Sequence, residues 1–327
     1  METLKNYWRF TMTTNKKAKL SAYLSAPLSI VIGFILAILF FTFILKETSP
    51  VPIFIIFAII EAGSMALYGI LPDKGKNIAR MTSMFLIGSM LLLAAGILSS
   101  SNYQLEGFFF YLLSGTMSGV LIHFAMAKII GPIFFSRNWC SWGCWSSMVF
   151  DLLPFKKNVK WNSPRSGKLR YLHFFISLTL VAVLFYVFKY AFVQTDPAAL
   201  KNSMGTRTEL IWFLLGNLFY YVAGITLAFK YKDNRAFCKY LCPLTVTLKF
   251  TDKFTLLRIK GDQNSCNNCG TCSANCPMGI DIPAYVKAGT RVKSTECIMC
   301  MRCVANCPEA ALRTSIGLDF AGQEFLK

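Results

Sequence analysis

Residues 266–277 read CNNCGTCSANCP, and residues 297–308 repeat the pattern as CIMCMRCVANCP. Both stretches have the spacing Cys-x2-Cys-x2-Cys-x3-Cys-Pro, which is typical of bacterial proteins that bind two [4Fe–4S] clusters. Three thiolates two residues apart wrap three corners of one cubane, and the fourth cysteine crosses to the other cluster. A zinc site takes four ligands, commonly in Cys-x2-Cys pairs, so two matched four-cysteine runs favour iron–sulfur clusters over zinc.

This reading assigns eight cysteines to two clusters. The ligands predicted for the first cluster are Cys266, Cys269, Cys272 and Cys307. Those predicted for the second cluster are Cys297, Cys300, Cys303 and Cys276. We expect a short helix within 278–296, and more helix followed by a loose end after residue 309. Residues 259–327 are thus predicted to form a small, cytoplasmic α+β two-cluster ferredoxin domain.

The rest of the chain is too apolar for a soluble domain. The 327 residues are 54% hydrophobic and 15% charged, whereas soluble domains carry about a quarter charged residues. The net charge of +18 lies outside the tail, because residues 261–327 hold six basic and six acidic residues. Positive charge in the loops between apolar segments is typical of membrane proteins. We therefore expect membrane lipid, and no nucleic acid, as a partner.

Six apolar segments reach the length of about 20 residues that spans a bilayer. They lie at 27–46, 51–71, 82–100, 107–130, 172–193 and 209–229. In lipid such segments form helices, so residues 27–258 are predicted to be a six-helix transmembrane domain. A basic segment, 1–26, precedes it and shows no signal-peptide cleavage site. Lys and Arg gather in that segment and in the loops after the second, fourth and sixth helices, including 156–170. This places both termini in the cytoplasm of a bacterial-type inner membrane.

The four remaining cysteines form two Cys-x3-Cys pairs at predicted cytoplasmic helix ends. Residues 138–145 read NWCSWGCW and contain Cys140 and Cys144, and residues 237–244 read FCKYLCPL and contain Cys238 and Cys242. Spacing of four puts both sulfurs on one side of a helix or turn. Together the pairs offer a full set of thiolates for a third iron–sulfur cluster. Three alternatives stay open: a thiol–disulfide pair in each motif, a site for copper or another soft metal, and reduced structural cysteines.

Ionisable side chains inside predicted membrane helices are candidates for function. Glu61 lies in the middle of the second segment, and His123 and His173 are the two histidines of the chain. Glu61 is a candidate proton site beside a quinone. The histidines are candidates for binding a quinone or, as a pair, one haem. Packing roles remain the alternative for all three.

The combination of two Cys-x3-Cys motifs at helix ends and a double ferredoxin run resembles the NapH/NosR/CcoG group of membrane polyferredoxins. The resemblance covers roughly residues 110–310. The chain departs from the group at Trp145, where these proteins usually have proline. In addition, no segment before the first helix resembles the extracytoplasmic flavin-binding domain of the NosR type, so no covalent flavin is expected.

The resemblance implies a subunit that carries single electrons between a quinone or soluble cytoplasmic partner and other membrane redox subunits. Some members of the group serve nitrate or nitrous-oxide respiration, and others reduce copper during oxidase assembly. Two alternatives therefore stand beside electron relay. One is a membrane copper reductase that uses the paired membrane cysteines. The other is a non-catalytic assembly or anchor subunit.

Overall fold

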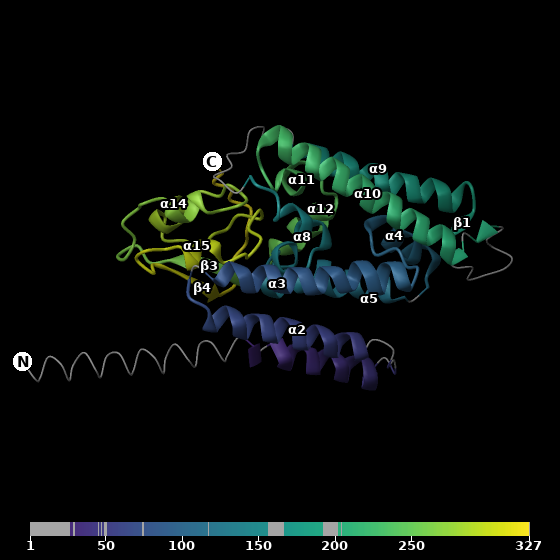
Figure 1. Ribbon diagram of the computed structural model, residues 1–327, viewed down its shortest axis with the longest axis horizontal. Coiled ribbons are helices and arrows are strands. Elements are labelled where there is room, and N and C mark those ends of the chain that lie inside the picture. The colour runs from purple at the N-terminus through teal and green to yellow at the C-terminus, as the bar shows by residue number, and fades with distance from the viewer. Residues whose placement is uncertain are drawn as a thin grey trace, which may run out of the picture. The chain divides into compact units, whose positions relative to one another are not determined.

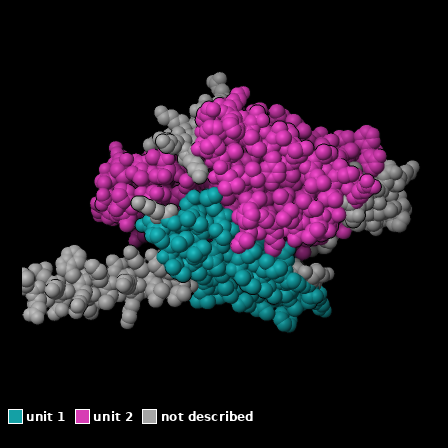
Figure 2. All heavy atoms as spheres, viewed as in Figure 1, with its two compact units in different colours: residues 1–83 teal, residues 84–327 magenta. Residues whose placement is uncertain are grey.

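The computed structural model describes residues 27–28, 30–44, 46, 48, 51–73, 75–116, 118–155, 167–191, 202–203 and 205–326. The predicted basic segment 1–26 and residues 156–166 of the basic connection lie outside the described residues. The chain divides into two compact units, residues 1–83 and 84–327, which Figure 2 colours separately. Each unit is described by itself.

The first unit contains two apolar helices and the start of a third. The first helix covers Ile30–Ile44 and ends in the π-helical turn η1 (Phe40–Ile44). The second is α2 (Val51–Ile70). The rings of Phe34 and Phe41 lie against Phe54, with centroids 6.2 and 5.3 Å away. Both helices are apolar around most of their circumference, which is expected of segments that contact lipid.

Four helices of the described residues are long and apolar enough to cross a membrane. They are α2, the continuous helix Lys76–Leu98 made of α3 (Lys76–Ser89) and η2 (Met90–Leu98), α9 (Leu169–Tyr186), and α10 (Gly205–Tyr231). They coincide with four of the six predicted segments, and α9 and α10 are labelled in Figure 1. Large apolar side chains on their surfaces are exposed, for example Leu98 and Val187, as expected of a lipid-facing surface.

The prediction of one uninterrupted helix over 107–130 is wrong. Two shorter apolar helices replace it: α4 (Leu105–Ser114), and a helix over Gly119–Phe135 built from α5 (Gly119–Phe124), η3 (Ala125–Ile130) and α6 (Gly131–Phe135). Gly115 ends α4 with a left-handed φ of 67°. Ser118 then caps the next helix by accepting a hydrogen bond from the amide of Leu121. Phe108 stacks on Phe124 with ring centroids 3.8 Å apart, so the two helices pack on each other.

Each Cys-x3-Cys motif lies where one short helix ends and another begins. The first motif joins α7 (Trp139–Trp142) to α8 (Trp145–Phe150), and the second joins α11 (Ala236–Tyr240) to α12 (Leu244–Asp252). The elements around them share one apolar core, in which Leu105, Phe110 and Phe124 are fully buried. A short parallel pair, β1 (Tyr190–Ala191) and β2 (Asn202–Ser203), lies between α9 and α10 in the sequence.

The C-terminal region has the expected mixed composition of small helices and strands. The strands β3 (Leu257–Gly261) and β4 (Leu312–Ile316) pair antiparallel, with Leu257 opposite Ile316 and Gly261 opposite Leu312. The helices are α13 (Thr271–Ala274), α14 (Ile282–Lys287) and α15 (Arg302–Ala305). Figure 1 labels α14 and α15 near the strands. The short helix expected within 278–296 is therefore present, as α14.

The expectation of a helix and a loose end after residue 309 is wrong. Residues 312–316 form β4 because their amides and carbonyls pair with β3. The tail beyond it is tied down by hydrogen bonds. Glu324 accepts bonds from the amide and hydroxyl of Thr295, at 2.9 and 2.6 Å, and the amide of Asp281 donates to the carbonyl of Phe325 at 2.8 Å.

The break at Gly115 supplies a test of the fold. We expect Gly115→Ala to destabilise the protein by about 1–2 kcal/mol, because a residue with a Cβ strains in the left-handed conformation. No atom lies within 4 Å of a Cβ built at Gly115, so a steric clash would not explain the loss. Gly63→Ala is the matched control, since Gly63 has equally open space and lies inside α2. Thermal unfolding in detergent should separate the two variants, and an equal effect would contradict the account.

Candidate metal centres

The first predicted set of four cysteines lines one pocket. Cys266, Cys269, Cys272 and Cys307 surround it, together with the prolines that follow or face them, Pro308 and Pro283. The space, including its open mouth, is about 340 Å³. Cys272 is buried on α13, whereas Cys269 is exposed at the surface. The structure thus brings together cysteines from both runs, with one edge of the pocket open to a partner.

The second predicted set lines a second pocket of similar size, about 390 Å³. Its cysteines are Cys276, Cys297, Cys300 and Cys303, so the last cysteine of the first run has crossed over. Met278, Ile280, Met299 and other apolar side chains complete the wall. None of these four cysteines is exposed, in contrast to Cys269.

Backbone amides are directed at the sulfurs of the second pocket. Burial raises the pKa of Cys276 to about 11, although the amides of Met278 and Ile280 donate to its sulfur. The amide of Met299 donates to the sulfur of Cys297 in the same way. A buried thiol with a raised pKa becomes a thiolate at neutral pH only when a metal cation displaces its proton. Thiolates that also accept amide bonds are typical iron–sulfur ligands, so these residues fit a cluster.

The two membrane motifs have the same local structure. In the first, the amides of Gly143 and Cys144 both donate to the carbonyl of Trp139, at 3.1 and 3.0 Å. In the second, the amides of Leu241 and Cys242 both donate to the carbonyl of Phe237, each at 2.9 Å. The replacement of proline by Trp145 therefore leaves the first turn equivalent to the second.

The four membrane cysteines lie within electrostatic range of one another. Burial raises the pKa of Cys242 to about 12, and negative charge on Cys238, Cys140 and Cys144 raises it further. Burial also raises the pKa of Cys238 to about 11, while Arg235 lowers it. A raised pKa weakens these two thiols of the second motif as redox nucleophiles. All twelve cysteines are free of disulfide bonds.

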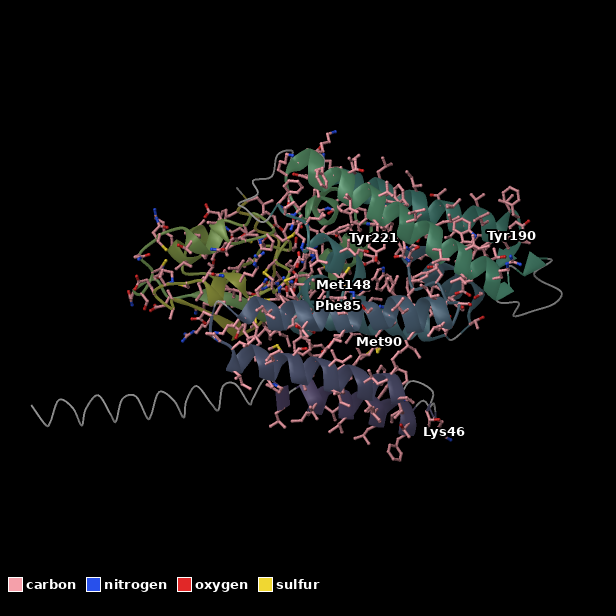
Figure 3. The ribbon with its side chains drawn as sticks, in the orientation of Figure 1. Lys46, Phe85, Met90, Met148, Tyr190 and Tyr221 are labelled. Atoms are coloured by element: carbon pink, nitrogen blue, oxygen red, sulfur yellow. The ribbon has the colours of Figure 1, made fainter. Side chains whose placement is uncertain are left out.

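Cations and hydrogen-bond donors surround this third group of sulfurs. Lys128 is buried inside the helix over Gly119–Phe135 and lies within electrostatic range of Cys140, Cys144 and Cys242. Its ammonium also lies 3.9 Å from the centre of the Trp139 ring. Several buried donors have no hydrogen-bond partner among the described residues. They include the hydroxyls of Tyr220 and Tyr221, Nε of Arg235 and Nε1 of Trp139. Of these residues, Tyr221 is labelled in Figure 3.

An anionic group with several acceptor atoms would fit these surroundings. Four thiolates around a cubane supply such a group, because its sulfides accept hydrogen bonds and its charge is negative. Within the part of the chain that the structure describes, no three His, Cys, Asp or Glu side chains lie close enough to hold a single metal ion. A cubane differs from such a site, since each of its irons binds one cysteine.

The structure places each histidine against one membrane motif. The ring of His123 lies 4.9 Å from the ring of Trp139, which precedes Cys140, and 5.5 Å from that of Tyr103. Nδ1 of His173 lies 2.9 Å from the carbonyl of Leu241, which precedes Cys242. A carbonyl only accepts, so Nδ1 carries the proton of this bond. Glu61 lies midway along α2, in the first unit, with a half-buried side chain.

The first membrane motif contacts the loop that carries the second pocket. The hydroxyl of Ser141 donates to the carbonyl of Ile298 at 2.6 Å, and Nε1 of Trp142 donates to that of Met299 at 3.1 Å. Both donors lie between Cys140 and Cys144 in the sequence. Cys140 itself packs against the apolar core of the ferredoxin domain. The third group of cysteines and the second pocket therefore share an interface.

The carboxylate of Glu296 forms ion pairs with three cations across this interface. Glu296 directly precedes Cys297 and is 1% exposed. Its oxygens accept from Arg137 at 3.0 Å and from Arg170 at 2.6 Å, and Lys249 binds the same carboxylate. Burial alone would raise the pKa of Glu296, but the three cations hold it well below its ordinary value. We call these four residues the Glu296 cluster.

Most of this polar framework was not predicted from the sequence. One available signal was a matched arginine three residues before each motif, Arg137 and Arg235. A second was Lys128, a charged residue within an apolar segment, where charges are candidates for function by default. No local pattern marks Glu296 or Ser141, because their partners lie far away in the sequence: 47 residues for Lys249 and more than 100 for Arg137, Arg170 and Ile298.

Comparison with known proteins agrees with this geometry. A family described as a 4Fe-4S dicluster domain matches residues 258–308. An uncharacterized protein of Methanocaldococcus jannaschii is 27% identical over 215 residues, covering 63% of this chain and 82% of that protein. The putative electron transport protein YccM of Escherichia coli is 26% identical over 208 residues, or 58% of this chain and 54% of YccM. The ferredoxin-type protein NapH of Haemophilus influenzae is 30% identical over 95 residues, or 28% and 33% of the two chains. No solved structure matches the chain.

The Glu296 cluster predicts a strong effect of removing one charge. Glu296→Gln leaves three cations around a neutral amide, and breaking a buried pair in this way costs about 3–5 kcal/mol. We expect the unfolding midpoint in detergent to fall and the interface to become accessible to protease. Glu309→Gln is the control, because Glu309 is exposed and exposed pairs contribute at most about 1 kcal/mol. Equal stability of the two variants would contradict the assignment.

The Glu296 cluster also predicts how the stability of the protein depends on pH. Because the pKa of Glu296 is depressed on folding, its contribution to stability is fully present above the ordinary carboxyl value of 4.5. It is lost only as the pH falls below that value and through the folded pKa. The difference in stability between wild type and Glu296→Gln should therefore stay constant from pH 6 to 8 and shrink in acid.

Proposed function

Because the chain is a member of the NapH-type membrane polyferredoxins, we propose that it relays single electrons through three iron–sulfur centres. Centre 1 is held by Cys266, Cys269, Cys272 and Cys307. Centre 2 is held by Cys276, Cys297, Cys300 and Cys303. Centre 3 is held by the four membrane cysteines, Cys140, Cys144, Cys238 and Cys242. When bound, the clusters supply reversible one-electron chemistry.

The observation that carries this proposal is the contact between the first membrane motif and the loop of centre 2. Ser141 and Trp142 donate hydrogen bonds directly into that loop. A contact that only attached the ferredoxin domain could be made anywhere on the membrane domain, whereas Ser141 and Trp142 lie between Cys140 and Cys144. Their position supports a relay in which centre 2 exchanges electrons with centre 3.

Exposure supports the order of the three centres. Cys269 of centre 1 is exposed, so a soluble donor or acceptor can approach this end. The loop of centre 2 contacts the membrane motif, and two buried cysteines, Cys276 and Cys303, together with an apolar wall, shield this centre from water. Centre 3 is enclosed by elements of the membrane domain, where other membrane redox subunits would exchange electrons with it. Both termini are proposed to be cytoplasmic.

The charges around centre 3 support a cluster there. Four thiolates around an oxidised cubane core give a net charge of about −2, and burying such a charge requires cations or donors nearby. Lys128 and Arg235 supply positive charge. Arg235 also ties the two motifs together, because its Nη1 donates to the carbonyl of Cys140 at 2.9 Å. Glu61, His123 and His173 each remain a proposed quinone or proton site.

Iron analysis tests the three-centre proposal. Anaerobically purified wild type should contain about twelve iron atoms and twelve sulfides, and Cys140→Ser/Cys238→Ser about eight of each. Low-temperature electron paramagnetic resonance should lose one signal in the variant. About eight irons in both proteins would overturn centre 3. Copper bound to the wild type and lost in the variant would instead favour the copper-reductase alternative.

A further inference from the structure

The carbonyls of the loop around centre 2 are capped by one short stretch of the membrane domain. Ser136, Ser141 and Trp142 donate to the carbonyls of Cys297, Ile298 and Met299 respectively. The three bonds differ in length, at 3.4, 2.6 and 3.1 Å. The bond from Ser141 is the shortest, and both of its partners are buried, with Ser141 0% and Ile298 2% exposed.

The carbonyl that Ser141 caps belongs to the same peptide unit as an amide directed at a sulfur. The carbonyl of Ile298 and the amide of Met299 are the two ends of one planar peptide group. That amide donates to the sulfur of Cys297. A donor on the carbonyl end withdraws electron density and makes the amide end a stronger donor, because hydrogen bonds in a chain polarise one another. The hydroxyl of Ser141 also lies 3.2 Å from the carbonyl of Asn138, a longer contact.

We propose that Ser141, a residue of the membrane motif, raises the reduction potential of centre 2 by polarising the peptide between Ile298 and Met299. The inference rests on the proposed function, because it requires a cluster at centre 2. An electron that enters centre 2 adds one negative charge, and a donor to its thiolate stabilises that charge. Ser141 is thus a positioning residue that acts through a peptide and not by direct contact with the cluster.

This arrangement links the properties of two centres. Ser141 is covalently adjacent to Cys140, a ligand of centre 3. The amide of Met299 donates a hydrogen bond to the sulfur of Cys297. The carbonyl of the same peptide accepts one from the hydroxyl of Ser141, in the motif that holds centre 3. A conformational change in the turn at Cys140 would therefore move the hydroxyl of Ser141 and change the reduction potential of centre 2.

The test is a redox titration of the full-length protein in detergent, followed by electron paramagnetic resonance. In Ser141→Ala the potential of centre 2 should become more negative, while that of centre 1 stays unchanged. Cooperativity strengthens a hydrogen bond by roughly 10–30%, and here the strengthened bond is the one from the Met299 amide to the sulfur of Cys297. Without it, we expect about a threefold lower ratio of reduced to oxidised centre 2 at a fixed potential. At 59 mV per decade for one electron, this is about 30 mV. Ser141→Thr keeps the hydroxyl and should restore the wild-type potential.

Ser136→Ala is the matched control, because it removes a hydroxyl from the same interface whose contact is long, 3.4 Å. The proposal predicts no shift of centre 2 in this variant. An equal shift in Ser136→Ala and Ser141→Ala would show that loosening of the interface is responsible, and would overturn the proposal. An unchanged potential in Ser141→Ala, with the signal of centre 2 present, would also overturn it.

Two further outcomes are distinguishable. If the Ala variant fails to assemble, Ser141→Gly removes the same hydroxyl and must show the same negative shift. If wild type itself lacks the signal of centre 2, the proposed function fails together with this inference. A normal signal that does not respond to Ser141 overturns the inference alone.

Discussion

The ion pairs of Glu296 are the constraint on which the second unit depends. A carboxylate one residue before Cys297 accepts from Arg137, Arg170 and Lys249, which come from three different parts of the membrane domain. Three cations around one buried carboxylate leave an excess of positive charge, and two of the cations, Arg137 and Arg170, are themselves buried. Such an arrangement is stable only when other negative groups lie nearby. Anionic clusters at centres 2 and 3 would supply that charge.

The Glu296 cluster also joins the second pocket to the first membrane motif. It holds the loop of centre 2 against the first membrane motif, where Ser141 and Trp142 cap its carbonyls. One amide of that loop, that of Met299, is directed at the sulfur of Cys297. The carbonyl of the same peptide accepts a hydrogen bond from Ser141 of the membrane domain. Under the proposed relay, this interface would be part of the electron path.

Local spacing determined what the sequence could predict. The two pockets bring together the cysteines that the double run predicts, including the exchange of Cys276 and Cys307, because the spacing of such a run marks three ligands of one cluster and the fourth of the other. The helix over 107–130 was predicted wrongly because hydropathy does not register the left-handed φ of Gly115. The strand β4 was missed because it depends on pairing with β3, about 50 residues away. Ile298, the partner of Ser141, and the two arginines that bind Glu296 lie more than 100 residues away, beyond any local pattern.

Magnetic interaction between centres 2 and 3 tests the central claim most directly, because two paramagnetic clusters affect each other's spectra only at short distance. In fully reduced wild type, the electron paramagnetic resonance signal of centre 2 should be broadened by its neighbour. In Cys140→Ser/Cys144→Ser it should sharpen to that of an isolated cluster, while centre 1 stays unchanged. An identical line shape of centre 2 in both proteins would contradict a relay from the ferredoxin domain to the membrane cysteines.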